Sequence, residues 1–298
     1  MGILSDKLKD LITNNVPYLD SKTPSAKIVS ICSQKGGVGK TTTAVNLSVA
    51  LSRYHLKKVL LIDLDPQGHV QTSVQKLISD GQEYELLSSI LTSKRGNLVN
   101  AVVESKIKDF HLTPGDKNLV ETEMVLNGRI GKEFILKDAI KAASRSYDYI
   151  IIDCPPHLGT LTVNALVASK FVIIPCEMSL LALEGVSDLY DTIETVQERL
   201  NPGLEILGIL LTRVDGRNLL LNAEVRSEIN RYFGSGVFDT IISVNSALNR
   251  AQLSGEPIFD FDSSSSGARN YKLFTQELLT RLNDDFVAED KKVSELAS

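Results

Sequence analysis

Residues 33–43, SQKGGVGKTTT, carry the strongest structural signal in this sequence. They follow the pattern of a phosphate-binding loop, G-x-x-x-x-G-K-[ST], although Gln34 occupies the position of its first glycine. The apolar run KIVSIC precedes the loop and a helical pattern follows it, which is the strand–loop–helix setting that such a loop requires. A second lysine, Lys35, precedes Lys40, and the ordinary pattern gives it no role.

The residue types of this loop suit the phosphates of a nucleotide. Its glycines let the backbone curl so that successive N–H groups point at phosphate oxygens, and the dipole of the following helix adds a positive end. Lys40 is expected to bind the β- and γ-phosphates, and the Thr41 hydroxyl to ligate Mg²⁺. We therefore predict that these residues bind nucleotide: Gly36, Gly37, Val38, Gly39, Lys40, Thr41 and Thr42.

The composition is that of an ordinary globular protein. The chain has 298 residues, of which 43% are hydrophobic and 23% charged, enough for one large α/β domain or two small ones. Its net charge of -5 gives no global reason to expect nucleic-acid binding, which would need a local basic patch. The three cysteines, Cys32, Cys154 and Cys176, do not have the spacing of a disulfide framework or a metal site. We therefore expect them to be reduced thiols in an intracellular protein. No apolar run approaches the roughly 18 residues that span a bilayer.

Apolar runs of strand length alternate with helical patterns along the chain. The runs are nearly continuous and rich in β-branched residues, as expected for strands buried on both faces: KIVSIC, KVLLIDLD, YDYIIIDCP, KFVIIPC and LEILGILLT. Helical periodicity is found in residues 39–53, 181–200 and 219–233. This alternation predicts an α/β fold with a mostly parallel, twisted sheet and helices on both faces.

The domain organisation follows from these patterns. No long linker interrupts residues 27–286, so one domain is expected there. Residues 1–26 are expected to form an N-terminal extension, and its amphipathic stretch ILSDKLKDLI favours packing on its own domain or on a dimer mate over binding to a membrane surface. Residues 287–298 are predicted to be a flexible, polar tail.

Lys35 completes the pattern K-G-G-x-G-K-[ST], the deviant Walker A motif, and with it the sequence resembles the ParA/MinD family of ATPases, the ParA/Soj-type partition ATPases in particular. The resemblance implies a P-loop NTPase fold, ATP and Mg²⁺ as cofactors, and a homodimer that forms with ATP. It implies that Lys35 of each protomer reaches the nucleotide of the other, a contact of the arginine-finger class that accelerates hydrolysis ~10³–10⁵-fold. Lys35, Lys40 and Asp65 are then the catalytic residues.

Two further segments match this family. VLLIDLDPQG matches its switch segment, in which Asp65 positions or activates the attacking water and touches the Mg²⁺ shell, while Asp63 supports that shell. YIIIDCPPHLG matches its Walker B-like strand, whose Asp153 holds Mg²⁺ through water. The resemblance thus implies a metal site of Thr41, Asp65 and Asp153. His157 stands where close relatives carry serine, and we interpret it as a loop residue and not as a ligand.

The segment ISVNSALNRA departs from the family pattern I-P-R-N-V-R-L-S-E-A. Asn245, which in the family helps to hold the adenine, is kept, and Ser243 replaces the proline beside the base. Val244 and Ala247 replace two arginines, the second of which is linked in the family to non-specific DNA binding. The resemblance therefore implies a nucleotide contact from Ser243 and Asn245 and an altered DNA surface.

Other basic residues are candidates for that surface. Arg217, in VDGRN, matches the second DNA-linked arginine of the family, and Arg250 follows Ala247 by one turn if this segment is helical. We predict that Arg217 and Arg250 bind DNA, with Arg213 and Lys272 contributing. The alternative is that Arg217 and Arg250 are solvated surface charges.

The resemblance implies a cytoplasmic ATPase that is associated with the nucleoid when ATP is bound. Its ATP-bound dimer would bind DNA without sequence preference, and a ParB-like or cargo-adaptor protein would stimulate hydrolysis. The cargo would be a chromosome, a plasmid or a protein cluster. One alternative is a MinD-like ATPase acting on a membrane surface or a protein scaffold, but the acidic balance of the C-terminal end predicts no stable membrane association. An ATP-dependent enzyme on the same fold is another, and such enzymes often carry paired cysteines that this chain lacks.

Overall fold

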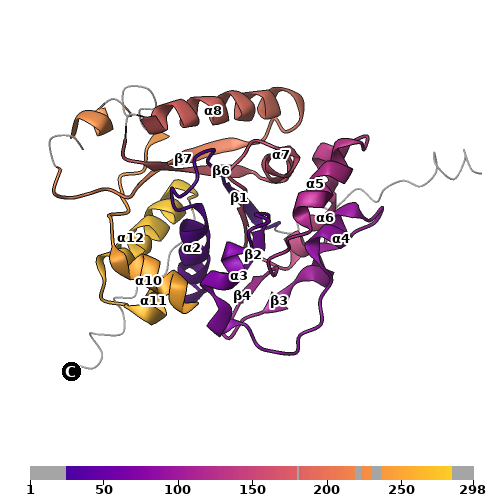
Figure 1. Cartoon of the computed structure of the whole chain (residues 1–298), viewed down its shortest axis with the longest axis horizontal. Helices are drawn as coiled ribbons and strands as arrows, with labels where there is room; N and C mark the ends of the chain where they lie inside the picture. Colours follow the sequence, from indigo (N-terminus) through magenta and orange to yellow (C-terminus); the bar gives the residue numbers. More distant parts are fainter. Residues whose placement is uncertain (1–24, 180, 219–222, 228, 230–235, 284–298) are drawn as a thin grey trace, which may run out of the picture.

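The computed structural model describes residues 25–179, 181–218, 223–227, 229 and 236–283. Within these residues a seven-stranded sheet forms the centre of the molecule (Figure 1), with the strand order β3-β4-β2-β5-β1-β6-β7. All neighbouring strands run parallel except β3 and β4. The strands are β1 (Lys27–Ile31), β2 (Val59–Asp63), β3 (Val103–Glu104), β4 (Phe110–Leu112), β5 (Tyr149–Asp153), β6 (Phe171–Glu177) and β7 (Glu205–Thr212).

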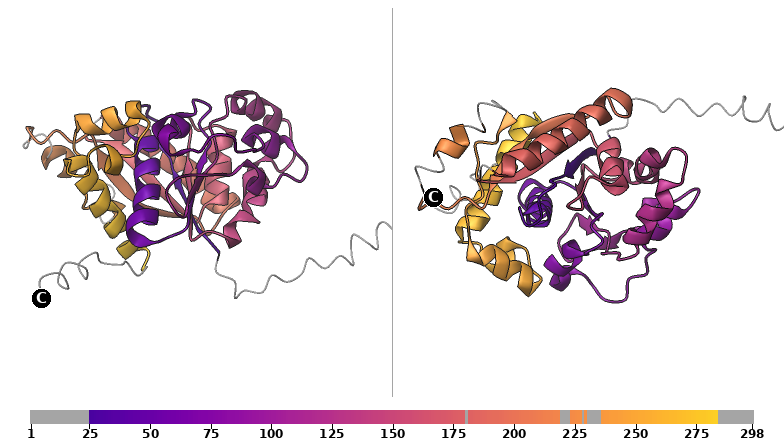
Figure 2. Two further views of the ribbon diagram at one scale, coloured as in Figure 1. Left: turned by 90° about the horizontal axis from the view of Figure 1, so that it is seen from below. Right: turned by 45° about the horizontal axis from the view of Figure 1, so that its top comes forward.

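Helices cover both faces of the sheet (Figures 1 and 2). One face carries α2 (Lys40–His55), α3 (His69–Ser73), α10 (Ser246–Ser254), α11 (Ile258–Phe261) and α12 (Ser266–Arg281). The other carries α4 (Leu87–Thr92), α5 (Leu119–Asn127), α6 (Ile135–Ile140), α7 (Thr160–Ala168) and α8 (Leu181–Arg199). Short 3₁₀ turns complete the described elements: η1 (Gln75–Leu77), η2 (Leu98–Ala101), η3 (Lys132–Phe134) and η4 (Ala143–Arg145).

The central strands are largely apolar because they contribute side chains to two cores. In β2, Leu60 and Ile62 pack into the core beneath α4–α8, whereas Val59 and Leu61 pack into the core beneath α2 and α12. Successive side chains of a strand point to opposite faces, so a strand covered on both sides needs an apolar residue at every position. This explains the continuous runs seen in the sequence, and β2 and β5 are buried at every residue.

The predicted fold class is confirmed, and each predicted strand is present as β1, β2, β5, β6 or β7. The helical patterns of residues 39–53 and 181–200 correspond to α2 and α8. Most of the predicted helix at 219–233 lies outside the described residues, as do the tail and all but the last two residues of the extension. β3 and β4, which have two and three residues, were not among the strands predicted from the sequence.

Candidate functional site

The parallel register brings the candidate residues to one edge of the sheet. Asp153 at the end of β5 is paired with Ile31 of β1 on one side and with Asp63 of β2 on the other. The loop that contains Lys35 and Lys40 leaves β1 at this edge, and Asp65 follows β2 there. Residues far apart in the chain therefore meet because three neighbouring strands end at the same level.

The phosphate-binding loop depends on two glycines with left-handed backbone conformation. Gly37 has φ 74° and Gly39 has φ 89°, a region that residues with a Cβ rarely adopt. Gly39 is also the N-cap of α2 and provides no side-chain cap, so N–H groups of the first turn remain available for an anion. The Thr212 hydroxyl donates to the Val38 carbonyl oxygen at 2.8 Å and fixes the loop to the end of β7.

Thr41 and Asp153 form the core of a candidate metal site. The Thr41 hydroxyl donates to Asp153 Oδ2 at 2.6 Å, whereas the buried Oδ1 of Asp153 has no hydrogen-bond partner. Burial raises the pKa of Asp153 to about 7, the charge of Asp65 adds to the rise, and Thr41 and Lys40 oppose it. A carboxylate with an unsatisfied buried oxygen beside a hydroxyl is a donor set that suits Mg²⁺.

Asp63 holds the segment that carries Asp65. The two carboxylate oxygens of Asp63 accept hydrogen bonds from the backbone N–H groups of Asp65 (3.1 Å) and Val70 (3.2 Å). Its complete burial, together with the nearby charge of Asp153, raises its pKa well above the ordinary value. Asp65 itself is almost buried, and its Oδ1 accepts the N–H of Gln67 at 3.0 Å. Asp63 therefore fixes the backbone of the segment that carries Asp65, and its support of the Mg²⁺ shell stays a prediction.

Two glycines join the loops that follow β2 and β4. A Cβ on Gly115 would lie 2.6 Å from the Cα of Gly68, which is closer than real contacts allow. Gly68 is the N-cap of α3 with φ 65°, and Gly115 leads toward α5. The backbone of the loop that carries Asp65 thus lies directly against the backbone of the loop before α5.

The additional lysine has a partner that the sequence analysis did not predict. Lys35 Nζ lies 2.5 Å from Glu177 Oε2 at the end of β6, and Arg213 Nε lies 3.9 Å from the other oxygen of that carboxylate. The hydrogen bond from Lys35 lowers the pKa of Glu177. Arg213, which has φ 52°, also donates to the Gly37 carbonyl oxygen at 3.1 Å. Glu177 therefore holds Lys35 within its own chain, although the Lys35 side chain is still 41% exposed.

Ser243 and Asn245 have structural partners beside α10. Asn245 Oδ1 accepts the N–H of Ala247 at 2.7 Å and caps α10, while its Nδ2 donates to the Ser266 hydroxyl at 2.7 Å. The N–H of Ser243 donates to Asn270 Oδ1 at 3.3 Å. Their contact with adenine remains a prediction, because the amide of Asn245 is already used in capping.

The candidate DNA-binding arginines lie on separate elements. Arg217, on the loop after β7, is exposed and binds both carboxylate oxygens of Asp215, with Nη2–Oδ2 at 2.7 Å and Nε–Oδ1 at 2.9 Å. Arg250 of α10 lies over the ring of Phe261, 5.2 Å from its centroid. Lys272 lies in the same way over the ring of Tyr54. The intrachain partner of Arg217 was not anticipated, although it is only two residues away.

Comparison with known proteins identifies the family. A model of the family described as "AAA domain" matches residues 26–206. The sporulation initiation inhibitor protein Soj of Bacillus subtilis is 40% identical over 254 residues, which cover 85% of this chain and 98% of Soj. This chain is a member of the ParA/Soj family of P-loop ATPases. The chromosome partitioning protein ParA of Caulobacter vibrioides is 37% identical over 260 residues, which cover 87% of this chain and 96% of that protein.

Solved structures with about a third of their residues identical to this chain share its fold. The cobyrinic acid a,c-diamide synthase of Mycobacterium smegmatis with bound ADP and magnesium has a TM-score of 0.72 and 30% identity, and covers 88% of this chain and 100% of its own. The same protein has also been solved with an ATP analogue and magnesium. The predicted ParA/Soj resemblance is therefore confirmed. In the part of the chain that the structure describes, no helix has the length and apolar character needed to cross a membrane.

Proposed function

We propose that this ParA/Soj-family member is an ATPase that binds ATP with Mg²⁺, dimerises around it and drives the partition or positioning of a cargo. The observation that carries this proposal is the meeting of Lys35 and Lys40 with Asp65 and the Thr41–Asp153 pair at one edge of the sheet. The dimer would bind DNA without sequence preference, so the protein would be cytoplasmic and nucleoid-associated with ATP. A ParB-like or cargo-adaptor protein would stimulate hydrolysis.

Different residues of the loop and its neighbours would bind the phosphates and the metal. The N–H groups of the loop and Lys40 would bind the phosphates, and Thr41 with Asp153 would hold Mg²⁺, directly and through water. When bound, Mg²⁺ neutralises charge that develops on the phosphate oxygens. Lys40 Nζ lies 3.3 Å from the Lys35 carbonyl oxygen, so it is already directed into the loop. Asp65, held by Asp63, would orient the attacking water with its second carboxylate oxygen.

Nucleotide binding should release a proton from Asp153. Because the pKa of Asp153 is raised to about 7, the carboxyl is largely protonated at pH 6 and largely ionised at pH 8. A proton competes with the metal, so the apparent affinity for Mg²⁺-ATP should fall by up to about tenfold for each pH unit below 7. Calorimetry in buffers of different ionisation enthalpy should detect close to one released proton at pH 6 and almost none at pH 8.

Asp153→Asn is the matched control for this experiment, because the amide keeps the size of the side chain and has no proton to release in this range. Its residual binding should be independent of the buffer. Equal proton release by the wild type at both pH values would contradict the assignment of Asp153 to the metal site.

DNA binding would require Arg217 to exchange or share its partner. Arg217 lowers the pKa of Asp215 to about 2, so Asp215 is ionised at physiological pH and cancels much of the charge of Arg217 in the free protein. Val244 and Ala247 replace two arginines of the family pattern, which leaves fewer cations for phosphates. Dimerisation would offset this loss because it presents two copies of Arg217 and Arg250 to one duplex.

The variants Arg217→Glu and Asp215→Asn should therefore change DNA affinity in opposite directions. Arg217→Glu should abolish ATP-dependent binding to random-sequence DNA, whereas Asp215→Asn should strengthen it because Arg217 is released. Arg250→Glu should weaken binding without affecting nucleotide affinity. Filter binding at several salt concentrations would measure a log–log slope of roughly -0.9 per neutralised phosphate. Weaker binding by Asp215→Asn would contradict this role of Arg217.

A MinD-like action on a membrane surface or protein scaffold is the alternative within the same fold. Gel shifts on random-sequence DNA and liposome flotation, each with and without ATP, would separate the two. ATP-dependent DNA binding with no flotation supports the partition ATPase. Flotation with ATP and no DNA binding at low salt would refute the DNA-based mechanism.

A further inference from the structure

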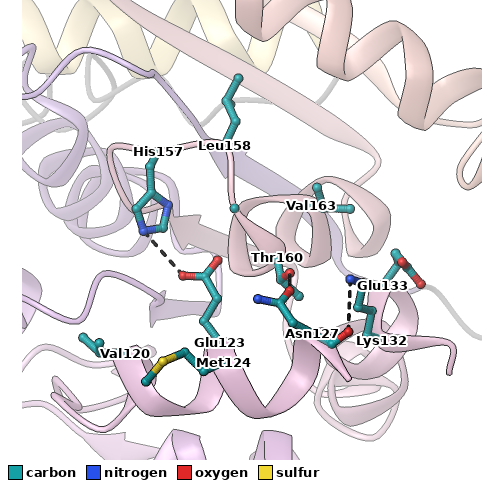
Figure 3. Close-up of a pocket in the computed structure, with 11 residues that line it drawn as sticks. Val120, Glu123, Met124, Asn127, Lys132, Glu133, His157, Leu158, Thr160 and Val163 are labelled. Atoms are coloured by element: carbon teal, nitrogen blue, oxygen red, sulfur yellow. Dashed lines mark hydrogen bonds and ion pairs between the residues drawn. The ribbon is translucent and has the colours of Figure 1, made fainter. Parts of the chain in front are cut away.

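A pocket of about 700 Å³ lies beside α5, on the face of the sheet that carries α4–α8 (Figure 3). Its apolar lining comes from Val120 and Met124 of α5, Leu158 of the β5–α7 loop and Val163 of α7, and we call this site the α5 groove. Met124 is 64% exposed and Val120 is 53% exposed. Apolar side chains gathered in a hollow are typical of a surface that binds another segment of protein.

The walls of the α5 groove are fixed by hydrogen bonds. Glu123 Oε1 of α5 accepts the N–H of Leu161 at 3.2 Å and thereby caps α7, and Glu123 Oε2 lies 3.5 Å from His157 Nε2. A Cβ at position 159 would overlap the Glu123 carboxylate, so a side chain there would push this carboxylate aside. The groove is therefore preformed, and polar side chains (Glu123, Asn127, His157 and Thr160) line it beside the apolar ones.

The chain itself contains a segment of matching character outside the described residues. Residues 3–12, ILSDKLKDLI, place Ile3, Leu4, Leu8, Leu11 and Ile12 at helical spacing with charged residues between them. The family match begins only at residue 26, and Soj is matched over 98% of its length by 85% of this chain. The segment is thus an addition to the domain that the relatives share, and its apolar residues favour packing against a protein surface.

The chain enters the fold at the start of β1, at the edge of the sheet opposite the β5–α7 loop, and the residues before it are numerous enough to reach the groove. The N–H of Ala26 donates to the Ser144 carbonyl oxygen, and Ala26 packs in the same core as α5, α6 and α7. Residues 13–24 span up to about 40 Å when extended, which is comparable to the width of a domain of this size. The rim residues Lys132 and Glu133 offer both signs of charge, which matches the alternating Asp6, Lys7, Lys9 and Asp10.

We propose that residues 3–12 dock through their apolar side chains into the α5 groove of their own chain. This assigns the N-terminal extension a binding site on the wall formed by α5 and the β5–α7 loop. The loop begins next to Asp153, so the docked segment lies near the nucleotide site without contributing to it.

Cross-linking in the full-length protein tests the proposal. The three native cysteines are buried, so Leu8→Cys with Met124→Cys creates an accessible pair for a short bismaleimide. The matched control pairs Leu8→Cys with Leu253→Cys on α10, which is 88% exposed and lies on the opposite face of the sheet. Peptide mass spectrometry should find the intrachain link to position 124 at least tenfold enriched over the link to position 253. Equal yields, or links mainly between two chains, would overturn the proposal, the latter assigning the groove to a second copy.

Oxidation of Met124 provides a second measurement that needs no cysteine variant. Hydrogen peroxide converts exposed methionine to its sulfoxide, so a docked segment should protect Met124. We expect Leu8→Asp combined with Leu11→Asp to accelerate sulfoxide formation at Met124 several-fold, with the rate at Met178 unchanged as the internal reference. These substitutions lie outside the shared domain and therefore should not unfold it. An unchanged rate at Met124 would show that another protein, or no segment at all, occupies the groove.

Discussion

Lys35→Ala should retain ATP binding but lose the ATP-dependent dimer. The substitution leaves Lys40 and Thr41 in place, and removes the cation that is expected to reach the nucleotide of the partner subunit. Contacts of this class accelerate phosphoryl transfer by ~10³–10⁵-fold, so turnover should fall by a factor of this order. Analytical ultracentrifugation with ATP, alongside a phosphate-release assay, would measure both effects.

Glu177→Gln tests the same ion pair from its other side and complements Lys35→Ala. The carboxylate of Glu177 holds Lys35 at 2.5 Å, so the proposed contact of Lys35 with another subunit would require this ion pair to break. The amide keeps the shape of the side chain and removes its charge, and the variant should therefore dimerise at lower ATP or protein concentration than the wild type. A Lys35→Ala protein that dimerises fully with ATP would exclude the cross-dimer role.

Asp65→Ala should trap the ATP-bound dimer. It removes the carboxylate that is expected to orient the attacking water, while the groups that hold nucleotide and metal remain. Positioned acid–base groups contribute typically 10²–10⁴-fold, so turnover should fall by about that factor and the dimer should live longer. Single-turnover hydrolysis and the rate of dimer dissociation would measure the two consequences.

Two controls separate this effect from loss of the nucleotide. Lys40→Ala should abolish ATP binding at micromolar concentrations, because each charge-assisted hydrogen bond contributes about 1.5–3 kcal/mol and Lys40 would make one to each of two phosphates. Asp63→Asn should lower turnover while retaining Asp65, because the amide has one accepting oxygen and leaves the N–H of Asp65 or Val70 without its acceptor. Hydrolysis by Asp65→Ala at the wild-type rate would refute the catalytic assignment.

The sequence predicted the regions of this fold in which local pattern and burial agree. The central strands are covered on both faces, so their composition alone indicated them, and the loop between β1 and α2 was recognised from its residue types. The edge strands β3 and β4 are too short to show any periodicity. Their pairing depends on contacts between segments that are distant in sequence, for which the local pattern contains no signal.

The same limit explains which site residues were missed. Glu177 was not assigned as the partner of Lys35 because four strands lie between them in the sequence. The two residues come together because β1 and β6 are neighbours in the sheet. The bond from Asn245 to Ser266 depends on where α12 begins beside α10, which the motif does not specify. The pairing of Arg217 with Asp215 is different, since residues two apart in a turn often bind one another, and this contact was foreseeable.

The contact between Gly68 and Gly115 has an evolutionary consequence. A side chain at Gly115 would strike the backbone beside it, and one at Gly68 would also face a strained left-handed conformation. Position 115 can therefore accept another residue only if the two loops move apart, whereas at position 68 the positive φ is the constraint. We expect descendants of this chain to keep the two glycines together or to exchange them together, and single replacements to be rare among functional lineages. The two glycines together thus preserve the close approach of the two loops.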